Sequence, residues 1–156
     1  LPIASSLELS DIEPYLKGYE TLEIHTVKDR PYDVMQVCDA IIAASGTATL
    51  EIALMGIPSV ITYKIAPLSY FILKRLVTID HIGLVNIVAE KNIVREFIQH
   101  EAQPEKIAAE ISRILTDNDY RKYMIHELNQ VKAKLGKEGG SNNVAQLAYD
   151  MLMDKI

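Results

Sequence analysis

The architecture of this chain can be read outward from one segment, Asp39-Ala-Ile-Ile-Ala-Ala-Ser-Gly-Thr-Ala-Thr-Leu-Glu-Ile-Ala-Leu-Met-Gly-Ile-Pro-Ser-Val-Ile-Thr-Tyr63. The apolar run at 40–44 predicts a strand that is covered on both faces. A helix is expected from about Thr47 to Met55, and Gly56 ends it because glycine readily adopts the left-handed conformation found at helix ends. Residues 59–63 then predict a second strand.

The polar turn Ser45-Gly46-Thr47 lies where the first strand ends and the helix begins. In α/β sheets this is the place where free backbone N–H groups and the helix dipole favour an anion. Glycine lets a ligand approach the backbone closely, and both hydroxyls can donate to a phosphate. The same residues also fit an ordinary helix cap with nothing bound. The turn therefore predicts either a phosphate site or a capped helix start.

Glu51 is the one carboxylate on this helix, and it follows the turn by one helical turn. Its carboxylate could reach back toward a ligand and accept two hydrogen bonds from a ribose diol. It could equally be a solvated helix carboxylate. Its neighbours are apolar, and a partly buried carboxylate needs a partner, which favours the binding role. Those neighbours are Leu50, Ile52, Ala53 and Leu54.

The remaining elements follow from periodicity, proline, glycine and capping residues. We expect strands at 21–27 and 83–88, and helices at 7–16, 30–37, 68–77, 92–100, from Pro104 onward, from Asp117 or Asn118 to Leu135, and at 142–153. The terminal helix should bury a stripe made of Val144, Leu147, Ala148, Met151 and Leu152. Strands and helices that alternate with short connections predict an α/β fold with a parallel sheet and helices on both faces.

Composition limits the functional classes. The 156 residues fit one domain, 49% are apolar, and the net charge of −5 with no basic stripe argues against a nucleic-acid partner. No apolar run approaches the ~18 residues that cross a bilayer. The single Cys38 is expected to act as a small buried apolar residue. These features suit a cytoplasmic protein.

Several familiar sites are absent from the sequence. It contains neither the Gly-x-Gly-x-x-Gly dinucleotide fingerprint nor a P-loop, and Ser45 lacks the context of a nucleophile elbow. The four histidines have no metal-ligand spacing, so no metal site is expected; they are His25, His81, His100 and His126. The apolar helix at 68–76 is expected in the core, and it is also the one segment suited to a bilayer surface.

The motifs together resemble the lipid-A-disaccharide synthase family over nearly the whole chain. The likeness begins at Ala44-Ser-Gly-Thr-Ala-Thr-Leu-Glu and continues to Lys64. It continues, in order, through Leu73-Lys-Arg-Leu-Val, Gly83-Leu-Val-Asn-Ile-Val-Ala, Val94-Arg-Glu-Phe-Ile-Gln, Pro104-Glu-Lys-Ile-Ala and Gly139-Gly-Ser. One departure is Val85, where the family pattern has proline before Asn86.

The resemblance implies a glycosyltransferase of the two-domain B type, with this chain (1–156) as most of its Rossmann-like C-terminal, donor-binding domain. The implied reaction transfers diacylglucosamine from UDP-2,3-diacylglucosamine to 2,3-diacylglucosamine 1-phosphate and releases UDP. By position, Ser45, Gly46 and Thr47 would hold the diphosphate, Glu51 the ribose, and Asn86 would line the donor pocket. No cofactor or metal is implied. Because the substrates carry acyl chains, peripheral contact with the inner membrane is expected.

The resemblance also implies missing parts. The acceptor domain with its presumed general base, and a first strand with a Gly-Ser-Arg loop, are expected ahead of Leu1. We therefore expect this chain alone to bind nucleotide weakly and to catalyse nothing.

Two alternatives stay open at this point. A UDP-N-acetylglucosamine 2-epimerase has a similar fold, but it predicts a Ser-Gly-Gly turn and paired glutamates, whereas this chain has Ala48, and Ile52 follows Glu51. The other alternative is a non-catalytic self-association module, in which the terminal helix exchanges between copies to form a homodimer.

Overall fold

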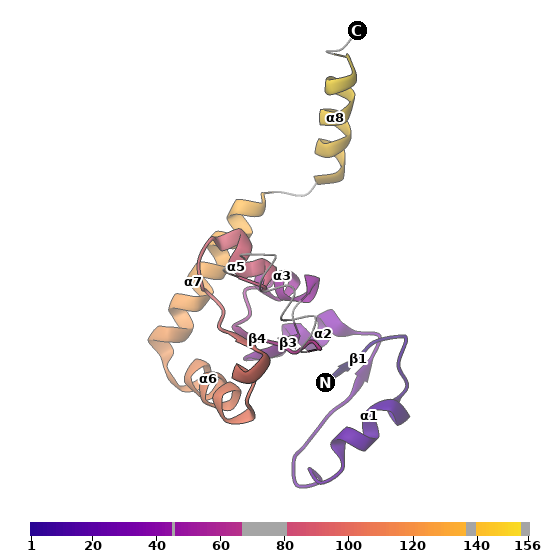
Figure 1. Cartoon of the computed structure of the whole chain (residues 1–156), viewed down its shortest axis with the longest axis vertical. Coiled ribbons are helices and arrows are strands. Elements are labelled where there is room, and N and C mark those ends of the chain that lie inside the picture. Colours follow the sequence, from indigo (N-terminus) through magenta and orange to yellow (C-terminus); the bar gives the residue numbers. More distant parts are fainter. Residues whose placement is uncertain (45, 67–80, 137–139, 154–156) are drawn as a thin grey trace.

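The computed structural model describes residues 1–44, 46–66, 81–136 and 140–153 (Figure 1). The helix expected at 68–77 lies outside the described residues. The elements, in chain order, are β1 (Pro2–Ile3), α1 (Leu9–Leu16), β2 (Val27–Lys28), α2 (Pro31–Gln36), β3 (Ile41–Ala44), α3 (Thr47–Leu54), β4 (Ser59–Tyr63), α5 (Leu84–Ala89), β5 (Glu96–Ile98), the 3-10 turn η1 (Gln99–Glu101), α6 (Pro104–Thr116), α7 (Asn118–Leu135) and α8 (Gly140–Met153).

All strand pairs of the described residues are parallel, as the sequence predicts. β1 pairs with β2, and β3, β4 and β5 form a second sheet in that order. Ala44 at the end of β3 is in register with Thr62, and Thr62 is in register with Phe97 of β5. Parallel strands end at the same edge of a sheet, so the segments that leave β3, β4 and β5 emerge side by side.

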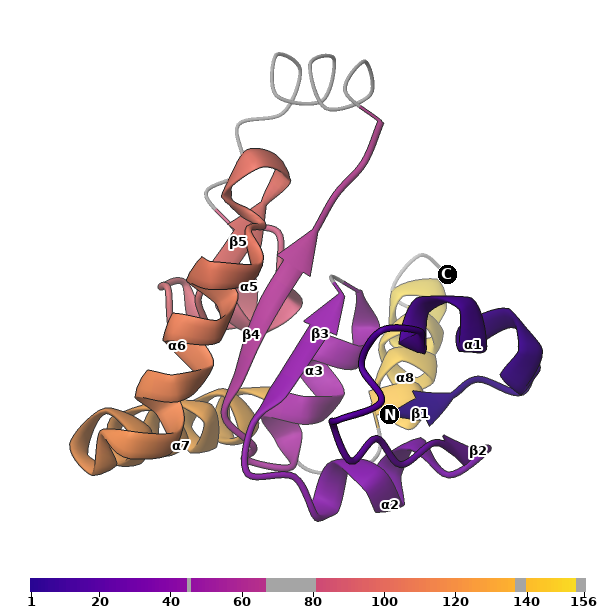
Figure 2. The same ribbon diagram turned by 90° about the horizontal axis from the view of Figure 1, so that it is seen from below.

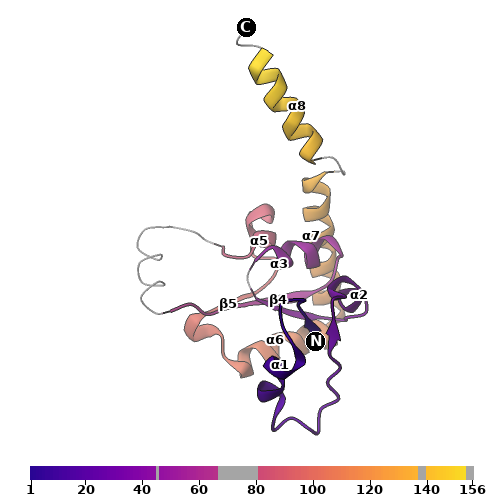
Figure 3. The same cartoon turned by 90° about the vertical axis from the view of Figure 1, so that its right-hand side faces the viewer.

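Helices cover both faces of the three-stranded sheet. Figure 3 shows α3, α5 and α7 on one side of it and α6 on the other, and Figure 2 shows the sheet from the α6 side. Val60 and Ile61 of β4 are fully buried between these layers and form the centre of the core. The rest of that core comes from α3, α5, β5, α6 and α7, with Ala53, Val85, Phe97, Ile114, Met124 and Leu128 as its main members.

The strand β3 departs from the prediction of two covered faces. Ala43 packs against Ile52 and Ile57 on the α3 side, but Ile42 on the opposite side is 55% exposed. Ile42 borders an open apolar groove that continues along α6 over Ile107 and Ile111. The apolar run at 40–44 is therefore buried on one face only within the described residues.

Two elements were predicted with the wrong type. Residues 83–88, expected as a short strand or extended segment, form the N-cap and most of helix α5, and residues 92–100, expected as a helix, contain strand β5 and the start of η1. The β-branched residues of α5 favour a strand locally, and packing against α3 and α7 overrides that preference. The strand predicted at 21–27 is also shorter than expected, because only Val27 and Lys28 pair.

The terminal helix forms at 140–153, but the expected buried stripe is wrong. Val144 is 68% exposed and Leu147 62% exposed, and Met151 and Leu152 are exposed as well. Figure 1 shows α8 projecting away from the other elements. Within the described chain, α8 therefore has no buried residue.

A polar cluster around the buried Glu110 joins α6 to α7 and to Arg95, directly before β5. The carboxylate of Glu110 is 3% exposed, accepts a hydrogen bond from the Tyr120 hydroxyl at 2.6 Å, and pairs with Arg95 at 3.2 Å. The Arg113 guanidinium lies 3.7 Å from the centroid of the Tyr120 ring. Burial, with the hydrogen bond to Glu110 as the second cause, raises the pKa of Tyr120 to about 12. The cluster fixes α6 against α7.

The raised pKa of Tyr120 predicts a loss of stability in alkali. Below pH 10, the ordinary tyrosine pKa, the hydroxyl keeps its proton in both states and its contribution is fully present. As the pH rises toward 12, the unfolded chain loses the proton first, so the free energy of unfolding falls. We expect urea denaturation of Tyr120→Phe to give about 1–2 kcal/mol less stability at neutral pH and a flatter alkaline decline. The exposed Tyr123→Phe on the same helix is the control, and an equal alkaline decline in both variants would contradict the assignment.

Candidate functional site

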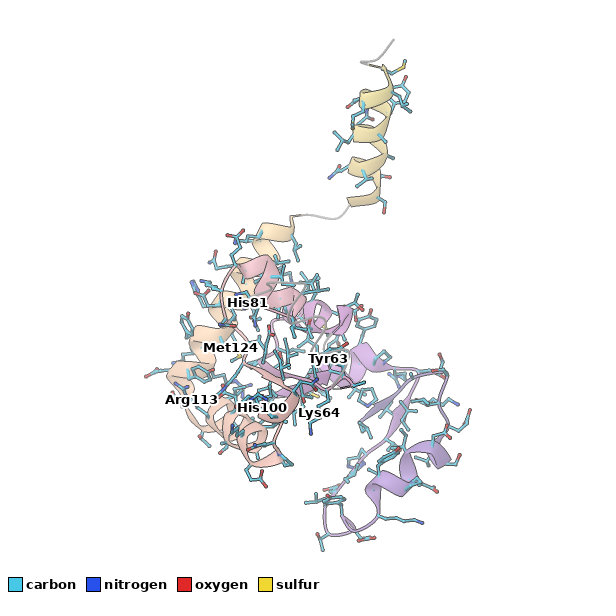
Figure 4. All side chains as sticks on the ribbon, viewed as in Figure 1. Tyr63, Lys64, His81, His100, Arg113 and Met124 are labelled. Carbon is cyan, nitrogen blue, oxygen red and sulfur yellow. The ribbon has the colours of Figure 1, made fainter. Side chains whose placement is uncertain are left out.

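The candidate site lies at the carboxyl edge of the three-stranded sheet. The chain leaves β3 at Ala44, passes through Ser45 and Gly46, and enters α3 at Thr47. Ser45 lies outside the described residues, so its predicted role stays a prediction. The neighbouring strand β4 ends at Tyr63, and Figure 4 places Tyr63 and Lys64 at that end of the strand.

Gly46 holds the turn in a conformation that suits glycine. Its φ is 154° and its ψ is −168°, a region that other residues adopt only with strain. Gly46 is exposed, and a Cβ built on it would meet no atom within 4 Å. The glycine is therefore required by the backbone angle rather than by crowding, and the described atoms around it leave room for a ligand.

Thr49 stabilises the turn at Gly46 through two hydrogen bonds. The sequence analysis did not identify it as a site residue. Its hydroxyl donates to the Gly46 carbonyl at 2.8 Å, its backbone N–H donates to the same oxygen at 3.2 Å, and the residue is buried. The signal in the sequence was a second threonine two residues after Thr47. By binding the Gly46 carbonyl, Thr49 fixes the direction of the first turn of α3.

The N-terminus of α3 carries no side-chain cap from the residues that the structure describes. The first backbone N–H groups of a helix have no partner inside the helix, so they need water, a cap or a ligand. With the helix dipole they form a positive end that attracts an anion. Gly46 has no side chain that could cap the helix, and the alternative of a cap by Ser45 or Thr47 stays open because Ser45 lies outside the described residues.

Glu51 lies on the same face of α3 as Thr47, since residues four apart are neighbours on a helix. Thr47 is exposed and Glu51 is half-buried. In the described part of the chain, the Glu51 carboxylate forms neither a hydrogen bond nor an ion pair. A half-buried carboxylate without a partner, one turn below free amides, is suited to accept hydrogen bonds from a bound ligand.

Asn86, the fifth predicted site residue, lies on α5 and is fully buried. Its side-chain N–H groups donate to the carbonyl of Val94 at 2.6 Å and to the carboxylate of Glu96 at 2.8 Å. Its carbonyl accepts from the N–H groups of Ile93 and Val94. The structure therefore places Asn86 between α5 and β5, while Gly46, Thr47 and Glu51 share α3 and its start.

Lys64 is a second residue that was not singled out. It is exposed, follows β4 directly, and makes no ion pair with a described residue. Because Ala44 is in register with Thr62, Gly46 and Lys64 each lie two residues beyond a paired position of adjacent strands. The sequence could have indicated this residue, because Lys64 directly follows a predicted strand. Its side chain adds a positive charge to this edge of the sheet.

The other titratable residues offer little to a metal or a second ligand. Among the described residues, no group of three or more His, Cys, Asp and Glu side chains could hold a metal ion. His81 is half-buried, and its Nδ1 has no hydrogen-bond partner within the part of the chain that the structure describes. Within the described ranges, no helix is long and apolar enough to cross a membrane.

The backbone angle of Gly46 predicts the effect of a side chain there. We expect Gly46→Ala to lower the free energy of unfolding by about 1–3 kcal/mol, because alanine is strained at this φ and ψ. The control is Gly140→Ala, since Gly140 also has open space around it but no positive φ, and it should cost little stability. Urea denaturation measures both. A Gly46→Ala chain as stable as wild type would show that the turn has a different conformation.

The comparisons with known proteins agree on one family. The family model described as lipid-A-disaccharide synthetase matches residues 4–151. The lipid-A-disaccharide synthase of Geobacter sulfurreducens is 53% identical over 156 residues, which is 100% of this chain and 40% of that relative. Those of Trichlorobacter lovleyi and Nitrosococcus oceani are 48% and 46% identical over 152 residues, which is 97% of this chain and 39% of each relative. The chain thus spans about 40% of the length of these relatives, and it belongs to the lipid-A-disaccharide synthetase family.

Proposed function

We propose that this chain is the donor-nucleotide-binding part of a glycosyltransferase that makes the lipid A disaccharide precursor. The proposed reaction transfers diacylglucosamine from UDP-2,3-diacylglucosamine to 2,3-diacylglucosamine 1-phosphate. Family membership over residues 4–151 supports the class of enzyme. The observation that carries the placement of the donor is the N-terminus of α3, which lies at the carboxyl edge of the sheet and has no side-chain cap from the described residues.

The diphosphate of UDP would bind at the start of α3. Gly46 lets the ligand approach the backbone, the first amides of α3 donate to phosphate oxygens, and the hydroxyls of Ser45 and Thr47 add further donors. Lys64 would contribute a positive charge from the next strand. These groups favour the additional negative charge that UDP acquires when its bond to the sugar breaks, so they stabilise the departing diphosphate. The proposed mechanism requires no metal.

Glu51 would bind the ribose. Its carboxylate can accept hydrogen bonds from both hydroxyls of the diol, and hydrogen bonds to a charged acceptor are the stronger kind. The spacing supports this role, because the diphosphate at Thr47 and the ribose at Glu51 would lie along one face of α3. A nucleotide without the 2′-hydroxyl should therefore bind less tightly.

The acceptor site and the general base would belong to a further domain, as the relatives are longer than this chain. This chain alone would then bind UDP weakly and turn over no substrate. We also propose that the enzyme works in the cytoplasm and contacts the inner membrane peripherally, because both substrates carry acyl chains.

A homodimer through α8 is a second proposal, and one observation favours it. The apolar residues Val144, Leu147, Met151 and Leu152 are exposed on this helix. An exposed apolar stripe of this kind is typical of an interaction surface. The same stripe also suits the alternative of a non-catalytic self-association module. No observation favours the 2-epimerase alternative.

The ribose contact gives the sharpest test of the proposed site. In an NMR titration of the 15N-labelled chain, we expect UDP to shift the amide resonances of Gly46 and Thr47 and to bind with a millimolar Kd. We expect 2′-deoxy-UDP to bind about tenfold more weakly, since one hydrogen bond to a charged group is lost. Glu51→Ala should remove this preference.

The matched control is Glu105→Ala, an exposed carboxylate in the first turn of α6. It should keep the preference for UDP. If UDP leaves the Gly46 and Thr47 resonances unchanged while sedimentation shows a tight dimer that does not respond to UDP, the self-association module is the better account. If Glu51→Ala keeps the full preference, Glu51 does not bind the ribose.

A further inference from the structure

We infer that Asn86 and Glu96 are positioning residues, which fix the backbone at Ile82 and Gly83 and thereby hold α5 against α3, and that Asn86 does not touch the nucleotide. This inference rests on the proposed function, since it concerns the support of the same nucleotide site. Glu96 was not among the residues that the sequence pointed to.

The side chain of Asn86 has no hydrogen-bonding capacity left for a ligand. An asparagine amide offers two N–H donors and one carbonyl oxygen with two lone pairs. The donors bind the Val94 carbonyl and the Glu96 carboxylate, and the oxygen accepts at 2.9 Å from Ile93 and at 3.0 Å from Val94. With an exposed fraction of 0%, the residue also offers no surface to a ligand. Direct contact with a nucleotide would require breaking one of these bonds.

The carboxylate of Glu96 accepts three hydrogen bonds, from Ile82, Gly83 and Asn86. One carboxylate oxygen accepts from the Gly83 N–H at 3.0 Å and from the Asn86 side chain at 2.8 Å, and the other accepts from the Ile82 N–H at 2.8 Å. Gly83 is the N-cap residue of α5, directly before Leu84. Three N–H donors on one carboxylate, two of them at the positive end of a helix, make a strong attachment between β5 and α5.

Gly83 also lies close to the side chain of Ile61 in the sheet. A Cβ on Gly83 would fall inside van der Waals contact of the Ile61 Cδ1, and it would also lie 3.2 Å from the Glu96 carboxylate. Ile61 is buried in the middle of β4. The corner at 82–83 is therefore held by the side chains of β4, β5 and Asn86 together.

The segment at Ile82 and Gly83 is connected to the proposed nucleotide site through the packing of α5 against α3. Ala53 of α3 lies in the same core cluster as Val85 and Ala89 of α5, and Leu50 packs against that cluster. Leu50 and Ala53 flank Glu51 in the sequence, so a displacement of α5 would change the orientation of the helix that carries Thr47 and Glu51. Glu96 holds this segment by accepting from the N–H groups of Ile82 and Gly83, directly before α5.

The first measurement uses the wild-type chain, so it does not depend on whether a variant folds. In the UDP titration by NMR, we expect the side-chain NH2 resonances of Asn86 to stay unchanged and to exchange slowly with deuterium, while the amides of Gly46 and Thr47 shift. Asn86 NH2 resonances that shift as far as those of Gly46 would overturn the inference and leave the proposed site standing. If Gly46 and Thr47 do not respond, the proposed function fails, and the inference fails with it.

The second measurement compares Glu96→Gln with Glu105→Gln, the same change at an exposed position of α6. Glutamine presents an NH2 group to N–H donors, so it cannot accept all three hydrogen bonds. We expect Glu96→Gln to speed deuterium exchange at Ile82 and Gly83 and to raise the Kd for UDP severalfold, and Glu105→Gln to do neither. Faster exchange with an unchanged Kd would show a structural role only and would overturn the positioning role.

Discussion

The parallel pairing of β3, β4 and β5 is the constraint on which the rest of the structure depends. Burial of Val60 and Ile61 between two layers of helices fixes β4 in the centre, and the register with β3 and β5 then sets where every connection emerges. The same edge is reinforced after β4, where the Gln99 side chain binds the Ile65 N–H at 3.1 Å and the Ile65 carbonyl at 3.0 Å. The start of α3 is thus held on a rigid frame.

Polar side chains bind the backbone near the starts of two helices over this frame. Asp117 caps α7 by accepting from the Tyr120 N–H, and Glu96 accepts from the N–H groups of Ile82 and Gly83, directly before α5. The start of α3 has no such side chain among the described residues. We propose that the start of α3 and the nearby Glu51 bind a ligand together, because the N-terminal amides and the dipole of a helix favour an anion.

Much of this organisation could be predicted from local sequence. The wrong predictions concern segments whose structure depends on contacts with distant parts of the chain. The glycine and polar residues around 45–56 specified β3, the turn and α3 correctly, and the identity of the family followed from motifs in order. The types of α5 and β5 were predicted wrongly because packing of α5 against α3 and α7 overrides its local preference for a strand. The hydrogen bonds of Asn86 to Val94 and Glu96 are contacts that no local pattern reveals, and its role toward the nucleotide stays a prediction. Whether Ile42 and the apolar residues of α8 are buried depends on which other elements pack against them, and the periodicity of the sequence does not specify those elements.

The central claim is that the amides opening α3 bind the diphosphate of a uridine nucleotide. The most direct measurement is a crystal structure of this chain with UDP. The account predicts phosphate oxygens within hydrogen-bond distance of the backbone N–H groups at Gly46 and Thr47, with the ribose hydroxyls on Glu51. A nucleotide bound elsewhere, with side chains filling the corner before α3 and Glu51 turned into solvent, would contradict it.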